Sequence, residues 1–205
     1  MSLSTRFMSR LVESLKIMDG TVYNVPFHNR RINMSRRELF GRIDDIDLNE
    51  MVQVTAECRS GLFKCRVLYR ETIEEIEILP YTRRKIESLK LVYCDDIDYS
   101  YKYEDRSFIQ ALLKRREGCD DILIVKNGFL ADASSANIVF FEGDRMVTPS
   151  TPLLRGTARE RMLEEGILTE ETLRPGDLGR FHKAALINAM CGIDDLVVDG
   201  KNIML

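Results

Sequence analysis

The chain has 205 residues, 44% apolar and 31% charged, a balance typical of globular rather than disordered proteins. This length can bury a sizeable core, in one large domain or two small ones. With 30 basic and 33 acidic residues the formal net charge is −3, which argues against a general affinity for nucleic acid or acidic membranes.

The cysteines and the first twenty residues indicate a cytoplasmic protein. Five cysteines are an odd number and form no Cys-x-x-Cys pair, so reduced thiols are expected rather than disulfides or a zinc site. Charged residues interrupt the first twenty positions, which leaves no apolar segment for a signal peptide. No run approaches the roughly 18 apolar residues of a membrane helix. No metal site is expected, since His28 and His182 lie far apart in sequence.

The N-terminal half predicts a mixture of strands and helices. The expected strands are the hairpin arms 11–17 and 21–25 and the segments 62–69, 73–79 and 89–93. The hairpin turns at Asp19-Gly20. One helix is expected over about residues 28–40, ended by Gly41. Asp47 is expected to cap a second helix, for which a strand over residues 52–55 is the rival interpretation.

The C-terminal half follows a polar segment without periodicity, residues 95–101, which we interpret as a linker. It separates a small α/β domain, residues 1–94, from a larger domain, residues 102–205. The expected strands are 121–125, 138–141, 146–148 and a final pair turning at Asp199-Gly200. The expected helices are 106–116, 156–165 and the start of the segment 184–198.

Two segments of this half carry candidate site residues. Asp132 and Asn137 flank four small residues in KNGFLADASSANIVFF, and small side chains let backbone approach a ligand closely. In LRGTARE, Gly156 begins a helix whose backbone N–H groups and dipole favour an anion such as phosphate. An ordinary loop-to-helix junction is the alternative interpretation. The chain has no G-x-S-x-G, P-loop or G-x-G-x-x-G motif, so the usual hydrolase, nucleotide and dinucleotide signatures are excluded.

The stretch GFLADASSANIVFFEGDRMVTPSTPLLRGTAR, residues 128–159, resembles the fold type IV pyridoxal-phosphate enzymes, also called class IV aminotransferases. This group contains the branched-chain and D-amino-acid aminotransferases and 4-amino-4-deoxychorismate lyase. Its pattern is an acid, small residues, Asn and an apolar strand, then Thr-Pro and a Leu-x-Gly-Ile-Thr-Arg helix start. The corresponding residues here are Asp132, Asn137, Thr148-Pro149 and Leu154–Arg159.

Two further segments match this group. Lys102 stands where the group carries its active lysine and begins a K-x-x-x-R pattern that ends at Arg106. HNRRINMS, residues 28–35, reproduces H-x-x-R-L-x-x-S, which makes Arg31 the arginine that holds the cofactor phosphate. The resemblance spans about residues 10–200. It implies an α+β, two-lobed, D-amino-acid-aminotransferase-like fold with a reduced N-terminal lobe.

The resemblance implies pyridoxal 5'-phosphate as cofactor and a role for each matched residue. Lys102 forms the Schiff base and shuttles the substrate α-proton. Asp132 faces the ring nitrogen and keeps it protonated, because a nearby opposite charge favours the charged form. Arg31 holds the phosphate together with backbone N–H groups of the helix start. The implied cofactor-binding residues are Arg31, Asp132, Asn137, Thr157, Ala158, Asn188 and Ala189.

Four departures from the group's pattern bear on function. Asp132 stands where Glu is usual, so the carboxylate is one methylene shorter. Thr157-Ala158 replaces Ile-Thr and loses a hydroxyl. Asn188-Ala189-Met190 stands where Ser or Thr hydroxyls often lie beside the phosphate. The chain also begins near the first hairpin, without the preceding strands and Gly-Asp-Gly segment that help to shape the substrate pocket.

Three functions remain open at this stage. The first is an active aminotransferase or 4-amino-4-deoxychorismate lyase that acts on a small amino-acid-type substrate, and the shared cofactor site does not separate these two reactions. The second is a degenerate relative that binds the cofactor or another phosphate ligand without turnover. The third is a structural protein in which Lys102 and Asp132 are surface and turn residues. The resemblance further implies a homodimer.

Overall fold

The computed structural model describes residues 9–204, whose contacts divide the chain into two compact units. Unit 1 runs to Arg83 and includes Tyr101–Asp105, whereas unit 2 comprises Arg84–Ser100 and the chain from Arg106 onward. The division therefore differs from the expected linker at 95–101. Tyr101–Asp105 belongs with unit 1 because it lies beside the first strand, where Val12 N donates to Lys102 O at 2.9 Å. Periodicity gives no sign of such a contact, since the segment is not a regular strand.

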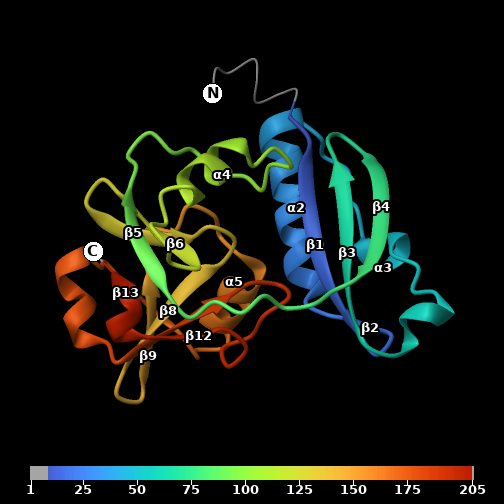
Figure 1. Ribbon diagram of the computed structural model, residues 1–205. Coiled ribbons are helices and arrows are strands. Elements are labelled where there is room, and N and C mark those ends of the chain that lie inside the picture. Colours follow the sequence, from blue (N-terminus) through green and yellow to red (C-terminus); the bar gives the residue numbers. More distant parts are fainter. Residues whose placement is uncertain (1–8, 205) are drawn as a thin grey trace. The chain divides into compact units, whose positions relative to one another are not determined.

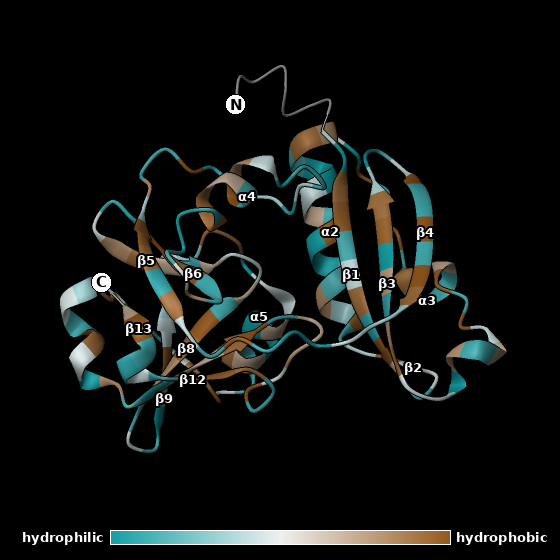
Figure 2. Cartoon of the chain, viewed as in Figure 1, coloured by the Kyte–Doolittle hydropathy of each residue, from teal (hydrophilic) through white to brown (hydrophobic). Residues whose placement is uncertain are grey.

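Unit 1 contains an antiparallel sheet in the order β2-β1-β3-β4 (Figure 1). Its strands are β1 (Leu11–Met18), β2 (Thr21–Val22), β3 (Leu62–Tyr69) and β4 (Ile73–Pro80). Hydrophobic and hydrophilic residues alternate along β3 and β4 in Figure 2, as expected for strands with one buried face. The predicted hairpin turn is confirmed, since Asp19 and Gly20 both have the positive φ of a tight turn. The second arm is shorter than the expected 21–25, because α2 already begins at Val25.

The main helix of unit 1 is α2 (Val25–Phe40), which contacts β1. It ends as predicted at Gly41, whose φ of 66° is left-handed. Asp47 caps α3 (Leu48–Met51), and the 3-10 helix η1 (Ala56–Arg59) follows. Residues 52–55 between them are neither helix nor strand, so the rival strand interpretation is wrong. Alternation alone does not make a strand without a partner, and β1 and β3 already pair with each other along their whole length.

Arg36 fastens α2 to the chain that follows it. Its side chain is fully buried, and Nη1 and Nη2 donate to Asp44 O at 2.6 Å and to Asp44 Oδ2 at 2.7 Å. Nε donates to Glu71 O at 2.8 Å in the turn between β3 and β4, and Nη1 also donates to Asn33 Oδ1 at 3.1 Å. These bonds satisfy a buried cation and join three parts of unit 1.

Unit 2 contains a sheet in the order β10-β9-β8-β7-β6-β5-β13, and β11 pairs with β8 and β12. Its strands are β5 (Leu89–Tyr93), β6 (Asp121–Lys126), β7 (Phe129–Ala133), β8 (Asn137–Glu142), β9 (Arg145–Pro149), β10 (Thr169–Glu171), β11 (Lys183–Ile187), β12 (Val197–Asp199) and β13 (Ile203–Met204). β5 and β6 are parallel, whereas β6, β7, β8 and β9 run antiparallel in turn. β7 pairs with β8 at Asp132 opposite Asn137.

Two helices cover apolar faces of unit 2. α4 (Ser107–Leu113) buries Ile109 and Leu112 in a cluster with residues of β5 and β6. α5 (Thr157–Glu164) buries Met162 in a cluster with residues of β8 and β11. The 3-10 helices η2 (Pro175–Arg180) and η3 (Gly200–Asn202) lie in the last third of the chain. In the described part of the chain no helix is long and apolar enough to cross a membrane.

The end of the chain departs from the sequence-based expectation. The expected helical start of the segment 184–198 is wrong, because these residues belong to β11 and Ala184–Ile187 are fully buried. A short apolar run of this kind suits a buried strand as well as a helix, and only its pairing with β8 decides. The expected final strand pair is also wrong, since β12 pairs with β11 while β13 pairs with β5.

We predict that Arg36→Gln lowers the free energy of unfolding of unit 1 by about 3 kcal/mol, because several buried acceptors lose their donor. Its neighbour Arg37 forms an exposed pair with Asp45, so Arg37→Gln is the matched control with little expected effect. Urea denaturation of both variants measures the difference. Equal effects of the two substitutions would contradict a structural role for Arg36.

Candidate active site

Glu13 is a buried carboxylate in an otherwise apolar series. On β1 the residues Leu11, Glu13, Leu15 and Ile17 alternate with more exposed ones, and all four are 0% exposed. The sequence analysis did not single out Glu13. The signal was present, however, because Glu13 falls in phase with apolar residues of period two. A buried carboxylate needs hydrogen-bond donors or positive charges that offset the free energy lost when it leaves water.

Those partners are Arg31 and His28, both on α2. Arg31 Nε donates to Glu13 Oε1 at 2.8 Å and Arg31 Nη2 donates to Oε2 at 2.6 Å. His28 Nδ1 lies 2.6 Å from the same Oε2. The two-pronged contact fixes the plane of the Arg31 guanidinium, which is the geometry that makes arginine suited to planar anions.

Charge and burial set the protonation of this cluster. Burial alone would raise the pKa of Glu13, but the charge and hydrogen bonds of Arg31, with the hydrogen bond of His28, lower it to about 2. Burial lowers the pKa of His28, which Glu13 opposes, and the positive charges of Arg31 and Lys102 lower it further. Neutral His28 therefore donates its Nδ1 proton to ionised Glu13.

Lys102 lies in the same neighbourhood. Its backbone is fixed beside β1 by the bond from Val12 N and by Arg10, whose guanidinium donates to Glu104 at 2.6 and 2.9 Å. Because the charges of Lys102 and Arg31 both act on the pKa of His28, unit 1 brings the predicted lysine and the predicted arginine near one buried histidine. Their spacing of about seventy residues in sequence gave no indication of this arrangement.

In unit 2, Asp132 and Asn137 form the centre of a second polar cluster. Asn137 Nδ2 donates to Asp132 Oδ1 at 2.8 Å, while the backbone N–H groups of Leu153 and Leu154 donate to Oδ2 at 2.9 and 3.0 Å. Asp132 is 5% exposed. Burial raises its pKa to about 6, although these hydrogen bonds oppose the shift. Asp132 is thus mostly ionised at neutral pH.

Asn137 also holds the segment that leads into α5. Its Nδ2 donates to Leu154 O at 2.8 Å. Its Oδ1 lies so close to Gly156 that a Cβ on this glycine would stand 2.0 Å away. The sequence pattern Asn with a later Gly before a helix therefore reflects direct packing between the two residues.

Gly156 precedes the first residues of α5, Thr157 and Ala158, which are 3% and 4% exposed. Glycine supplies no capping side chain, so the helix dipole and first-turn amides are not covered by one. An N-terminus of this kind favours an anion, although Glu160 in the first turn adds a negative charge.

The other predicted residues, Asn188 and Ala189, lie just after β11. Asn188 Oδ1 accepts from the backbone N–H groups of Met190 and Cys191 at 2.8 and 3.0 Å. Its Nδ2 donates to Ser135 O at 3.2 Å, in the small-residue loop between Asp132 and Asn137. Asn188 therefore supports this loop, while Ala189, half-buried, carries no functional group.

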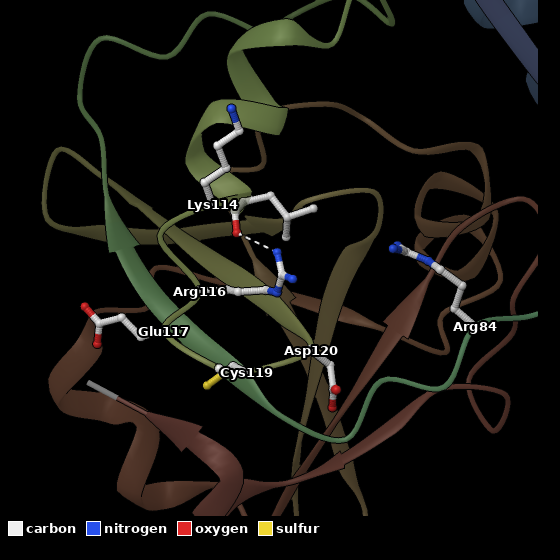
Figure 3. Close-up of a pocket in the computed structure, with 8 residues that line it drawn as sticks. Arg84, Lys114, Arg116, Glu117, Cys119 and Asp120 are labelled. Carbon is white, nitrogen blue, oxygen red and sulfur yellow. Dashed lines mark hydrogen bonds between the residues drawn. The ribbon is translucent and has the colours of Figure 1, made fainter.

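Figure 3 shows a hollow elsewhere in unit 2, at the end of α4. It is lined by Arg84, Leu113, Lys114, Arg116, Glu117, Gly118, Cys119 and Asp120. Arg116 donates to Leu113 O at 3.3 Å within it. These residues differ from the predicted site residues, so the hollow adds nothing to the two polar clusters.

Each unit, considered separately, holds groups of a type that a phosphorylated pyridine cofactor needs. Unit 1 has an arginine oriented by Glu13 and a lysine near it, and unit 2 has a helix start without a capping side chain. Asp132 Oδ1 accepts a hydrogen bond from Asn137, and since a carboxylate oxygen can accept two, it can take one more from a protonated ring nitrogen. The shorter side chain of Asp132 is therefore compatible with the predicted role.

Comparisons with known proteins agree with this fit. The amino-transferase class IV family matches residues 106–194. An uncharacterized protein from Haemophilus influenzae is 38% identical over 188 residues, which cover 91% of this chain and 100% of that protein. A candidate 4-amino-4-deoxychorismate lyase from Haemophilus somnus 129pt has a TM-score of 0.86 and 32% identity, with 90% of this chain and 98% of its own covered.

A hypothetical aminotransferase from Mycobacterium tuberculosis, solved in its PLP-bound form, shares the fold. Its TM-score is 0.76 at 19% identity, with 97% of this chain and 84% of that chain covered. Together with the Haemophilus somnus structure, it confirms the expected α+β, D-amino-acid-aminotransferase-like fold.

We predict that Gly156→Ala lowers the free energy of unfolding by about 2 kcal/mol, because the added methyl group meets an amide held by two hydrogen bonds. Gly176→Ala is the control, since nothing lies within 4 Å of a Cβ there. In the double variant with Asn137→Ala the cost of Gly156→Ala should shrink, because the obstacle is gone. Strictly additive effects in denaturation experiments would contradict the close packing.

We also predict a pH-dependent contribution from Glu13. Its folded pKa of about 2 lies below the 4.5 of a free glutamate, so its stabilisation is present above pH 4.5 and lost as pH falls towards 2. The stability difference between wild type and Glu13→Gln should therefore shrink over this range by on the order of 3 kcal/mol. Exposed Glu75 on β4 is the control, and Glu75→Gln should give no such trend. Amide hydrogen exchange of β1 measures the effect, and a pH-independent difference would refute it.

Proposed function

This chain belongs to the amino-transferase class IV family, and from that premise we propose that it is a pyridoxal-phosphate-dependent enzyme in which Lys102 supplies the reactive amine. The observation that carries the proposal is the cluster of unit 1. A lysine and a glutamate-oriented arginine both act on one buried histidine there. This arrangement also favours an active enzyme over a relative that binds a phosphate ligand without turnover.

The cofactor, when bound, supplies an electron sink for the carbanion that forms at the substrate α-carbon. Lys102 Nζ would hold the cofactor and would be the group that carries the substrate proton. Arg31, oriented by Glu13, would bind the phosphate with its guanidinium. Within unit 2, the first amides of α5 would be neutral donors to an anion. Asp132, held by Asn137 and two backbone amides, keeps a proton on the ring nitrogen through its remaining acceptor position.

Glu13 and His28 position Arg31. Ionised Glu13 prevents the Arg31 side chain from rotating, and neutral His28 adds no charge that would compete with the phosphate. Fixing a donor before the ligand arrives lowers the entropy lost on binding. The pair therefore prepares Arg31 for its ligand without touching that ligand.

Two reactions fit this site, and we propose both as candidates: amino transfer between small amino acids and keto acids, and release of pyruvate from 4-amino-4-deoxychorismate. The likeness to the Haemophilus somnus protein supports the lyase, and the fold shared with the Mycobacterium tuberculosis protein supports the transferase. Pyruvate release without a keto-acid acceptor identifies the lyase, whereas a requirement for an acceptor identifies the transferase. We also propose that the enzyme works in the cytoplasm as a homodimer.

We predict that borohydride fixes added pyridoxal phosphate covalently to Lys102. Mass spectrometry of the digested protein should place the label on the peptide that contains this residue, and Lys102→Ala should lose it. Lys201, an exposed lysine paired with Asp199, provides the control variant Lys201→Ala, which should keep the label. Labelling of Lys102→Ala to the extent of wild type, or no specific label in wild type, would refute the proposed function.

A further inference from the structure

Arg106, the arginine that ends the K-x-x-x-R pattern, has no role in the proposed function so far. Its Nη2 donates to Ser134 O at 2.5 Å. Its Nε is buried and makes no hydrogen bond to any residue from 9 to 204. Over the same residues no carboxylate forms an ion pair with it. The positive charge of this partly buried guanidinium is therefore balanced only by a hydrogen bond to one neutral carbonyl.

The other buried arginines of the protein do have carboxylate partners. Arg31 pairs with Glu13, Arg36 with Asp44, and Arg159 with Glu160 and Glu170. Removing a cation from water without a counter-charge costs free energy. A hydrogen bond to one neutral carbonyl offsets only a small part of that cost. Natural proteins retain such costs mainly where function uses them. An anion from outside the chain would supply the counter-charge that Arg106 does not have among residues 9–204.

The surroundings of Arg106 suit a small anion. Ser134 and Ser135 belong to the loop of small residues that the family resemblance sets against the cofactor. Arg84, 59% exposed, adds a second cation, with Nη2 3.5 Å from Ser135 Oγ, although the same atom lies 4.0 Å from buried Asp121 Oδ2. Asn188 holds the same loop through Ser135 O. Arg106 therefore provides the main positive charge at a loop without bulky side chains.

We propose that Arg106 binds the carboxylate of an amino-acid-type substrate, beside the Ser134-Ser135 loop. The inference rests on the proposed function and makes Arg106 a determinant of substrate class. A planar guanidinium matches a carboxylate with two parallel hydrogen bonds, whereas phosphate is already provided for by Arg31 and α5. Anchoring the carboxylate also fixes the carbon that bears the amine, which orients the reacting group.

The first test uses protein without cofactor. Pyruvate, the neutral analogue pyruvamide and inorganic phosphate are titrated while the amide NMR signals of Ser134 and Ser135 are followed. We expect wild type to prefer pyruvate, and Arg106→Gln to bind pyruvate roughly tenfold to hundredfold more weakly with pyruvamide unchanged. Arg115 is the matched control, an exposed arginine just beyond α4 that also donates to a backbone carbonyl, Tyr93 O at 3.2 Å.

Several results would overturn the inference. Undiminished pyruvate binding by Arg106→Gln, an equal loss in Arg115→Gln, or no pyruvate preference in wild type would each do so. Stronger binding of phosphate than of pyruvate at these amides would assign Arg106 to the cofactor instead. Arg106→Lys should recover part of the affinity, because it restores the charge but not the two-pronged geometry.

Thermal stability separates a binding role from a structural one. Because Arg106 lacks a carboxylate partner, Arg106→Met should leave the melting temperature unchanged or raise it. Arg159→Met leaves two carboxylates without their cation and should lower the melting temperature by several degrees. A melting temperature of Arg106→Met as low as that of Arg159→Met would make Arg106 a structural residue and refute the proposal.

The proposed function and this inference fail in different ways. Labelling of Lys102 together with normal pyruvate binding by Arg106→Gln would refute only the role of Arg106. Absence of the label together with an Arg106-dependent pyruvate preference would refute the cofactor chemistry, and Arg106 would remain a carboxylate site of another kind.

Discussion

The hydrogen bond between Asp132 and Asn137 is the contact on which unit 2 depends. β7 meets β8 at this residue pair, so the same two residues join the strands β13-β5-β6-β7 to the strands around β8. Their side chains then reach the backbone of Leu153 and Leu154, and Asn137 packs on Gly156. The start of α5 is thereby fixed relative to the sheet. One polar pair thus determines both the continuity of the sheet and the position of the expected phosphate donors.

Each unit arranges its polar groups around one buried carboxylate, but the two carboxylates differ in charge balance. Glu13 and Asp132 each accept three hydrogen bonds, yet the pKa of Glu13 is about 2 and that of Asp132 about 6. The difference comes from the donors. Glu13 faces the full positive charge of Arg31, whereas Asp132 bonds to neutral amides that only partly offset its burial. Glu13 therefore stays ionised and paired with Arg31, whereas a positive group placed beside Asp132 would lower the pKa of Asp132.

The arginines show how the chain separates structural charge from binding charge. Arg36 and Arg159 bond to backbone carbonyls and carboxylates within the protein and connect helices to loops or strands, although Arg159 Nε is buried without a hydrogen bond among the residues described. Arg31 is held by Glu13, and the proposed function assigns it the cofactor phosphate, so it combines both tasks. Arg106 has a single carbonyl partner among the residues described, which leaves its charge to a ligand. Pairing with carboxylates, rather than burial alone, therefore distinguishes these roles.

The sequence alone determined the elements with strong local signals. The turn at Asp19-Gly20, the helix ended by Gly41 and the strand over residues 73–79 were all predicted, because turn, cap and alternation signals are local. The family resemblance, carried by the ordered match from Asp132 to Arg159, gave the fold. The apolar run from Ala184 to Ile187 was misread, since both helix and strand suit it until β8 provides a partner.

Only the tertiary structure decided how the site residues are related. It brought Glu13 and His28 to Arg31, placed Lys102 near them, and left Arg106 without a carboxylate partner in the described part of the chain. These contacts join residues up to about ninety positions apart, and no local propensity encodes such a separation. A residue's type and its neighbours in sequence show what chemistry it can perform. Which groups it meets, and with what net charge, follows from packing and burial alone.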